Sequence, residues 1–310
     1  LFIFYLSIVG IETSRFNNII IKEIEKKDPN IKISLNKIKV KLDIKKIQLY
    51  FSTLEPQIIY QNIKIPIKEI SLYTKLISIL KSNNEIEKAI LFFENFNVND
   101  IQQLATRIKP SNFKTYLLNN LNDGKVEKIL VDVKLGKNLE IIDYKLNGSI
   151  KKVNIKVSKD LLIQDVSFNF VSDKNLTLIN SLNAKYQGIS ISNGSLSLRT
   201  LEQIDIEGKF NSQINISGDE IKKLFIKANL NFLEKYKVSV RGSLIHNFAL
   251  KIDENFKLAD YNYKLNGNIS DSEIVFADDF KSTFLENPIS RILIKKSDLE
   301  ITLNKGSNAL

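Results

Sequence analysis

Apolar and polar residues alternate along almost the whole second part of this 310-residue chain, from about Lys125 to the end. In the segments 144–150, 166–170 and 204–210, every second residue is apolar or glycine. A period of two places successive side chains on opposite faces of a β-strand. The pattern therefore predicts a long antiparallel sheet with one apolar and one polar face, and with little helix to cover the apolar face.

A short motif recurs in this region, in which two apolar residues, a glycine and a further apolar residue stand at alternate positions. It occurs at 144–150, 204–210, 238–244 and 263–269, and the pentapeptide Tyr-Lys-Leu-Asn-Gly is identical at 144–148 and 263–267. The motif glycines are Gly148, Gly208, Gly242 and Gly267. Each replaces a side chain on the predicted apolar face. A recurring strand glycine is typical of bending or of the close approach of another group, so we interpret the motif as a structural repeat.

The first 124 residues mix helices with short strands. An amphipathic helix is predicted from Thr13 to Lys27, ending before Pro29. Strands follow at 31–35, 38–44 and 47–51, and the apolar parity switches between them, which predicts a turn or bulge at each switch. The segment 63–67 contains Pro66 and is predicted to be an edge strand. Further helices are predicted at 73–80, 99–109 and 111–123.

Composition limits the classes of function. The chain has no cysteine, which excludes disulfides, thiol nucleophiles and cysteine-based metal sites. It has no methionine and begins at Leu1, so we expect it to be a piece of a longer protein. Residues 1–11 are uncharged and too few to cross a bilayer, which needs about 20 apolar residues. We interpret them as the distal part of a transmembrane anchor.

The formal charge of +10 is concentrated near the N-terminus, where residues 12–46 carry ten basic and five acidic side chains. Two interpretations are open: a solvated lysine-rich face, or attraction to anionic lipid headgroups beside the apolar segment. Nucleic-acid binding is not predicted, because the basic residues alternate with isoleucine and no RNP or helix-turn-helix signature is present.

Catalytic motifs are missing from the sequence. The lone histidine, His246, has no neighbouring Asp, Glu or Ser pattern and is interpreted as a surface residue at a strand end. Gly124-Lys125, Gly136-Lys137 and Gly208-Lys209 are followed by Val, Asn and Phe, so no phosphate-binding loop is present. We predict a protein that is not an enzyme and that uses neither a cofactor nor a metal.

The apolar face itself is the candidate site. We predict that the following side chains contact acyl chains: Phe168, Phe170, Leu182, Tyr186, Leu196, Leu198, Phe210, Leu230, Phe232, Val238, Val240, Phe248, Leu250 and Leu265. The alternative is that the same strands form a closed sandwich or solenoid with a dry core, as in a structural or adhesive surface protein. An outer-membrane barrel is disfavoured, because its strands run about 9–11 residues between aromatic girdles, whereas the predicted strands of this chain carry many lysines and no tryptophan.

The layout also resembles a known family. An apolar segment is followed by Glu12–Asn18, by the Lys-Ile strand 38–44, by the segment 55–60 and by the strands that carry the glycine motif. This order is similar to the N-terminal portion of AsmA-like proteins, in particular the YhdP/TamB branch of Gram-negative bacteria. The resemblance implies a single-pass inner-membrane anchor, a β-sheet curled into a groove in the periplasm, and a part in phospholipid transport to the outer membrane. It also implies a partner at the outer membrane, whose identity the sequence leaves unknown.

These inferences give one overall expectation. The chain is mainly β with a few helices, and a long, curled antiparallel sheet forms an open apolar groove. Residues 1–11 are a partial anchor, residues 12–124 an α+β module, and residues 125–310 the extended β-groove region. The expected partners are phospholipid acyl chains and the inner membrane.

Overall fold

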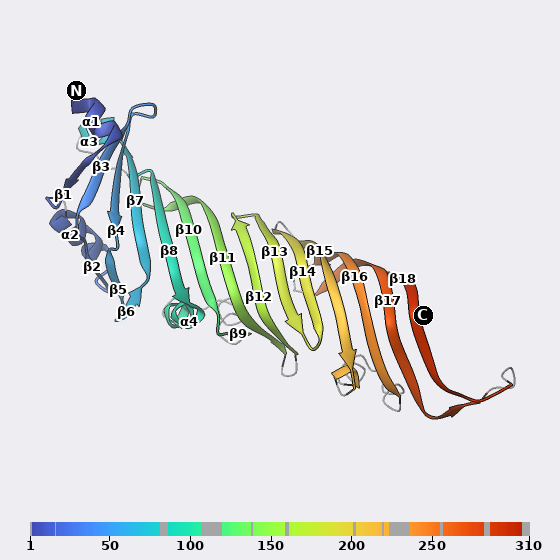
Figure 1. Cartoon of the computed structure of the whole chain (residues 1–310). Helices are drawn as coiled ribbons and strands as arrows, with labels where there is room; N and C mark the ends of the chain where they lie inside the picture. The colour runs from blue at the N-terminus through green and yellow to red at the C-terminus, as the bar shows by residue number, and fades with distance from the viewer. Residues whose placement is uncertain are drawn as a thin grey trace. The chain divides into compact units, whose positions relative to one another are not determined.

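The computed structural model describes residues 2–15, 17–80, 86–106, 120–137, 139–158, 161–200, 203–218, 220–222, 236–254, 257–281 and 286–305. The protein is mainly β, and fifteen of its strands belong to one large antiparallel sheet (Figure 1). This confirms the predicted class and the antiparallel sheet. A smaller sheet has three strands.

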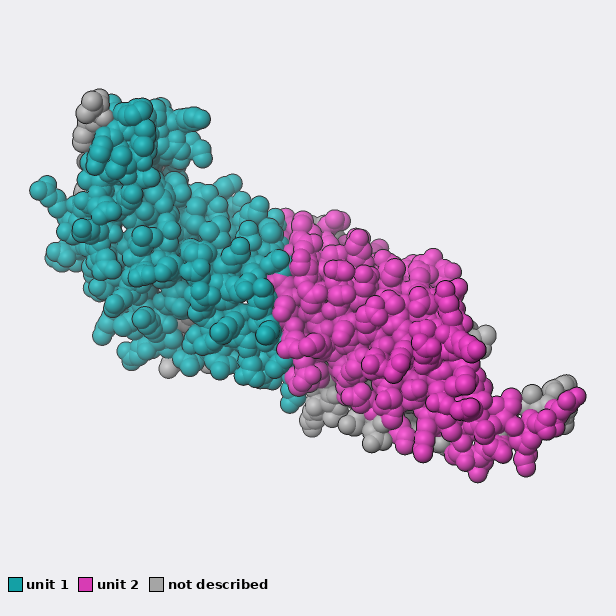
Figure 2. All heavy atoms as spheres, in the orientation of Figure 1, with its two compact units in different colours: residues 1–160, 169–174 teal, residues 161–168, 175–310 magenta. Residues whose placement is uncertain are grey.

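The chain divides into two compact units (Figure 2). Unit 1 comprises residues 1–160 and 169–174, and unit 2 comprises residues 161–168 and 175–310. The two units are defined by the contacts between residues within each of them. The boundary predicted from the sequence, between residues 124 and 125, separates the α+β module from the region of alternating strands, and it stays a prediction.

Unit 1 contains four of the described helices and the first strands of the large sheet. The helices are α1 (Phe2–Ile8), α2 (Asn17–Lys27), α3 (Leu76–Leu80) and α4 (Val98–Thr106). The large-sheet strands are β1 (Ile11–Thr13), β3 (Ile38–Asp43), β4 (Gln48–Leu54), β7 (Ile67–Lys75), β8 (Lys88–Asn97), β9 (Leu121–Asn122), β10 (Lys125–Leu135) and β11 (Ile141–Ser158). Their hydrogen-bonded order is β1-β3-β4-β7-β8-β10-β11, and β9 pairs with β11.

The small sheet has the order β2-β5-β6, with β2 at Ile31–Ser34, β5 at Gln57–Tyr60 and β6 at Ile63–Ile65. The parity switch after Leu35 lies where the polypeptide leaves β2 of the small sheet and enters β3 of the large sheet. The switch before Ile47 is the turn between β3 and β4. The predicted edge strand at 63–67 is right in part: β6 is an edge strand of the small sheet, but it ends at Ile65, and Ile67 after Pro66 begins β7 of the large sheet.

The helix predictions for unit 1 are right in part. Residues 13–15 do not belong to α2, which begins at Asn17, and Tyr73 to Lys75 extend strand β7 rather than opening α3. The predicted helix at 99–109 corresponds to α4. Most of the helix predicted at 111–123 lies outside the described residues, and Leu121 and Asn122 form β9.

Unit 2 carries the remaining strands in chain order, each paired with the next. They are β12 (Leu161–Ser172, which extends into unit 1), β13 (Leu176–Tyr186), β14 (Ile189–Thr200), β15 (Ile204–Ser217), β16 (Lys237–Ile252), β17 (Leu258–Phe280) and β18 (Ile289–Asn304). Antiparallel neighbours follow from the alternating pattern and from connections that are mostly short, although residues 218–236 separate β15 from β16.

β-Bulges interrupt the alternation. Ser181 in β13 and Asn193 in β14 have φ values of 55° and 52°, and the register between the two strands shifts at these positions. Asp165 in β12 also has a positive φ, of 53°. Each extra residue moves the following side chains to the other face and increases local bending and twist.

Candidate functional site

The register of unit 2 gathers most of the predicted apolar side chains on one face. Directly opposed residues in antiparallel strands point to the same side of the sheet. One row runs Leu196–Gly208–Phe248–Tyr263 across β14 to β17. A second row runs Leu198–Ile206–Leu250–Tyr261, and a third runs Phe210–His246–Leu265–Ile301 from β15 to β18.

The other predicted positions lie as follows. Tyr186 is opposite Ile189, which is opposite Ile214, so Tyr186 shares the apolar face. Val238 and Val240 pack with the buried Ile216 at one end of this face. Leu182 faces Gly194 beside the bulge in β13. Phe168 lies in the part of β12 that belongs to unit 2, and Phe170 belongs to unit 1. Leu230 and Phe232 lie outside the described residues.

The opposite face of the same strands is polar. The alternate residues of β15 are Asp205, Glu207, Lys209, Asn211 and Gln213. Their partners on β16 include Lys251, Asn247 and Ser243. The single-sided alternation predicted from the sequence is therefore present in β15 and β16.

Most of the apolar face is half-buried rather than sealed. Leu244 and Leu265 are 5% and 6% exposed, whereas Phe210, Phe248 and Leu250 keep intermediate exposure, and Ile301 is 37% exposed. Ile221, which follows β15, packs on Ile216 and Val238 at one end of the face. The described residues of unit 2 contribute no second sheet to cover the rest.

The motif glycines are sites of close approach, and the chain itself occupies the space. A Cβ on Gly208 would lie 2.5 Å from both Leu196 Cδ2 and Phe248 Cζ, and a Cβ on Gly148 would lie 2.5 Å from Phe170 Cε1. Aromatic rings thus cover these two glycines, as rings do in stable β-sheets. At Gly242 and Gly267 the nearest atoms are carbonyl oxygens of the neighbouring strands.

Three polar side chains form a hydrogen-bonded series across the apolar face. The sequence pattern did not predict this series. The hydroxyl of Ser212 lies 2.7 Å from His246 Nε2, and His246 Nδ1 lies 2.7 Å from the hydroxyl of Tyr263. The ring of Phe210 stacks on the imidazole, with centroids 4.2 Å apart. The interpretation of His246 as a surface residue at a strand end is wrong, because it is half-buried in the middle of β16.

The order Ser–His–Tyr matches the first two members of a nucleophile–base–orienting-group arrangement. Ser212 is only 1% exposed, so a substrate has no access to its hydroxyl in this structure. Backbone N–H groups on both sides of Ser212 lie within the β15 ladder, which leaves no free pair of donors for an oxyanion. We interpret the hydrogen-bonded series Ser212–His246–Tyr263 as a structural link between β15, β16 and β17.

The half-buried His246 imidazole predicts that the stability of the fold depends on pH. Burial lowers the pKa of the His246 imidazole below its ordinary value of 6.5. The unfolded chain therefore binds a proton more readily than the folded chain, and stability falls as the pH drops through 6.5 towards the lower folded value. We expect the urea midpoint to fall between about pH 7.5 and about pH 5.5, and His246→Gln to make this fall smaller. An equal fall in the variant would show that other groups cause it.

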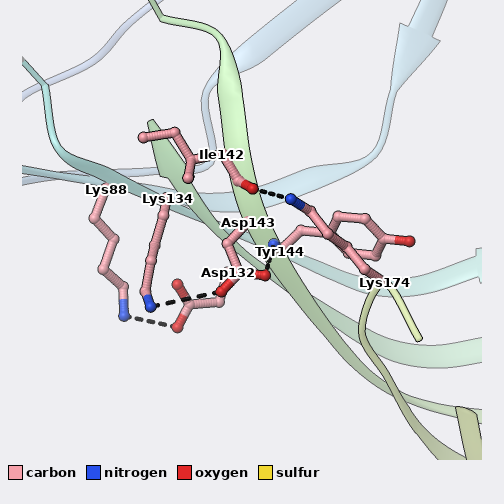
Figure 3. Close-up of polar contacts among 7 residues, drawn as sticks. All are labelled: Lys88, Asp132, Lys134, Ile142, Asp143, Tyr144 and Lys174. Carbon is pink, nitrogen blue, oxygen red and sulfur yellow. Dashed lines mark hydrogen bonds and ion pairs between the residues drawn. The ribbon is translucent and has the colours of Figure 1, made fainter. Parts of the chain in front are cut away.

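The polar face of unit 1 carries ion pairs rather than a reactive cluster. Lys88 Nζ lies 2.6 Å from Asp132 Oδ2, and Lys134 Nζ lies 3.5 Å from Asp143 Oδ2 (Figure 3). Lys174 donates a hydrogen bond to the carbonyl oxygen of Ile142 (Figure 3). These groups are partly or largely exposed, and exposed pairs contribute about 0–1 kcal/mol each. Ion pairs of this kind are typical of a solvent-exposed sheet face.

Within the described ranges, no group of three His, Asp or Glu side chains is arranged to hold a metal ion. In the same ranges, no helix has both the length and the apolar character to cross a bilayer. An open cavity of about 420 Å³ lies beside the bulge at Asp271, on the side of Arg241 and Lys295 rather than on the apolar face.

Comparisons with known proteins give little. No family model matches the chain, and no solved structure matches it. A search of curated proteins finds the ATP-dependent RNA helicase HrpA of Borreliella burgdorferi, 24% identical over 207 residues, which are 62% of this chain and 23% of the helicase. The chain thus spans about a quarter of the length of that relative.

Proposed function

We propose that this chain is part of a membrane-anchored β-groove protein that shields acyl chains and takes part in phospholipid transport between an inner and an outer membrane. The observation that carries the proposal is the half-exposed apolar face of β14 to β18, backed by a polar face on the same strands. Large exposed apolar surfaces of soluble domains are typical of binding sites. In this proposal the protein is not an enzyme, and it uses no cofactor.

Acyl chains suit such a face physically. Each CH₂ group removed from water contributes about 0.8 kcal/mol, and this attraction needs no directional partner. A chain lying across the strands contacts rows of branched and aromatic side chains. The bulges at Ser181 and Asn193 supply local bending, and in the proposal this bending curls the sheet around the lipid.

The membrane part of the proposal starts from the resemblance of the sequence to AsmA-like proteins. In the proposal, the bulk of the chain lies in the periplasm, and the N-terminal segment is a single-pass anchor at the inner membrane. Phospholipid acyl chains and the inner membrane are the proposed partners, together with an unidentified partner at the outer membrane.

The similarity to an RNA helicase does not lead us to propose ATP-dependent activity. Phosphate binding in such enzymes uses a glycine-rich loop that ends in Lys followed by Ser or Thr. Gly124-Lys125 precedes Val126, which is fully buried in β10, and Gly208-Lys209 lies in the middle of β15. Neither site offers the open loop that a nucleotide phosphate needs.

Fatty-acid uptake tests the proposal. We expect the purified chain to bind a fluorescent fatty acid saturably and to carry co-purified lipid that native mass spectrometry detects. Protein that is consistently lipid-free and takes up no fatty acid contradicts the proposal. That result instead favours the structural or adhesive alternative, in which the sheet closes over a dry core.

A further inference from the structure

Exposed apolar side chains gather at one end of unit 1. Helix α1 exposes Ile3, Phe4, Tyr5 and Ile8, the following residue Val9 is also exposed, and Phe4 is 67% exposed. Isolated exposed apolar residues are ordinary on a protein surface, but five within seven residues form a patch.

Two other segments add to this patch. The turn between β3 and β4 exposes Ile44 and Ile47, by 50% and 62%, and α3 exposes Ile77 by 55%. Within unit 1, α1, α3 and the β3–β4 turn lie at the same end (Figure 1). The Leu76 amide, at the start of α3, donates a hydrogen bond to the carbonyl oxygen of Ile47, 3.1 Å away. We call these eight side chains the end patch.

The fold explains why segments far apart in sequence meet here. Helix α1 leads through Gly10 into β1, which pairs with β3, and β4 pairs with β7, which leads into α3. The side chains of Lys39 and Lys41 pass beside Gly10, since a Cβ built there would lie 3.4 Å and 2.7 Å from them. The helix and the turn are therefore fixed to neighbouring strands.

Lysines lie in and beside the β3–β4 turn of the end patch. Lys45 and Lys46 stand between the two exposed isoleucines of the turn, and Lys39 and Lys41 follow β3 toward α1. None of these four lysines forms an ion pair with a carboxylate in the described part of the chain. The nearby carboxylate of Glu87 is paired with Lys75. Exposed apolar side chains interleaved with free lysines match the interface of an anionic bilayer, where apolar groups enter the acyl boundary and lysines meet headgroups.

We propose that the end patch seats unit 1 on an anionic bilayer surface, with the β3–β4 turn and α3 entering the interface beside α1. The inference deepens the membrane association of the proposed function by naming the contact surface and the class of lipid. It does not depend on acyl-chain binding by unit 2.

Vesicle co-sedimentation of the full chain tests the lysines. Vesicles of phosphatidylcholine alone are compared with vesicles that contain about 30% phosphatidylglycerol. We expect tighter binding to the anionic vesicles, and we expect Lys45→Gln/Lys46→Gln to weaken that binding roughly 30-fold. The matched control is Lys295→Gln/Lys296→Gln, which removes an adjacent exposed pair on β18 and leaves binding unchanged.

A second variant tests the apolar part. Ile47 has a φ of 51°, and asparagine adopts this conformation readily, so Ile44→Ser/Ile47→Asn keeps the turn. We expect it to weaken binding to both kinds of vesicle by about tenfold. Unchanged binding would mean that the turn stays out of the interface, and equal losses for the two lysine-pair variants would mean attraction by net charge alone. Either result overturns the proposal.

Fatty-acid uptake by the same variants separates this inference from the proposed function. We expect uptake to stay at the wild-type level, because the end patch belongs to unit 1 and the apolar rows of β14 to β18 belong to unit 2. Vesicle binding that responds as expected in a chain that takes up no fatty acid supports the end patch and contradicts only the groove.

Discussion

Asparagine in place of Ile206 is expected to weaken fatty-acid binding by about tenfold. Ile206 stands between Leu198 and Leu250 in a row of the apolar face, and it is only partly buried. An amide there presents polar atoms that an acyl chain cannot satisfy, while the fold keeps its ladder hydrogen bonds. Titration with a fluorescent fatty acid measures the change.

The control lies one residue away. Asp205→Asn places the same side chain on the polar face of the same strand, opposite Lys251. We expect this variant to bind fatty acid like the wild type. Equal losses in the two variants would indicate damage to β15, and wild-type binding by Ile206→Asn would remove the apolar face from the proposed site.

Local pattern was enough to predict the single-sided sheet. Alternation placed Phe210, Phe248, Leu250 and Leu265 on one face, and the observed register agrees. Gly208 has the same parity as Phe210 and lies on that face as well. These predictions succeeded because a strand has a fixed period of two, and a buried face allows little freedom in register.

The parity of apolar residues also indicates an irregularity in β12 and the face on which His246 lies. Leu161 and Ile163 are odd-numbered, whereas Val166 and Phe168 are even-numbered, and Asp165, which has a positive φ, lies between the two pairs. His246 shares the even parity of Leu244 and Phe248 in β16. Its place on the apolar face was therefore predictable, although its position was interpreted as a strand end.

Other features depend on contacts between distant segments. Ser212, His246 and Tyr263 meet only because β15, β16 and β17 pair in one register, and residues 218–236 separate the first two strands. The end patch likewise needs the order β1-β3-β4-β7, which brings residue 47 beside residue 76. Strand order is a non-local property, so the periodicity of a single segment does not contain it.

Alanine in place of Gly267 is expected to destabilise unit 2 by about 3 kcal/mol, at the upper end of overpacking costs. A Cβ there would lie 2.2 Å from the carbonyl oxygen of Ser243 and 2.8 Å from Leu244 Cα. Both are backbone atoms of β16, held by its ladder with β15, so relief requires one strand to move away from the other. The urea unfolding midpoint measures the loss.

Gly208→Ala makes the useful comparison, because the two glycines occupy equivalent places in the repeated motif. The atoms that meet a Cβ on Gly208 are the far ends of the Leu196 and Phe248 side chains, which can rotate away. We therefore expect a smaller cost of about 1 kcal/mol. Asn266→Ala, next to Gly267 but directed to the polar face, should cost less than about 0.5 kcal/mol. Equal losses at Gly208 and Gly267 would contradict the distinction between ring-covered and backbone-covered glycines. The repeated motif would then serve a single packing purpose along the sheet.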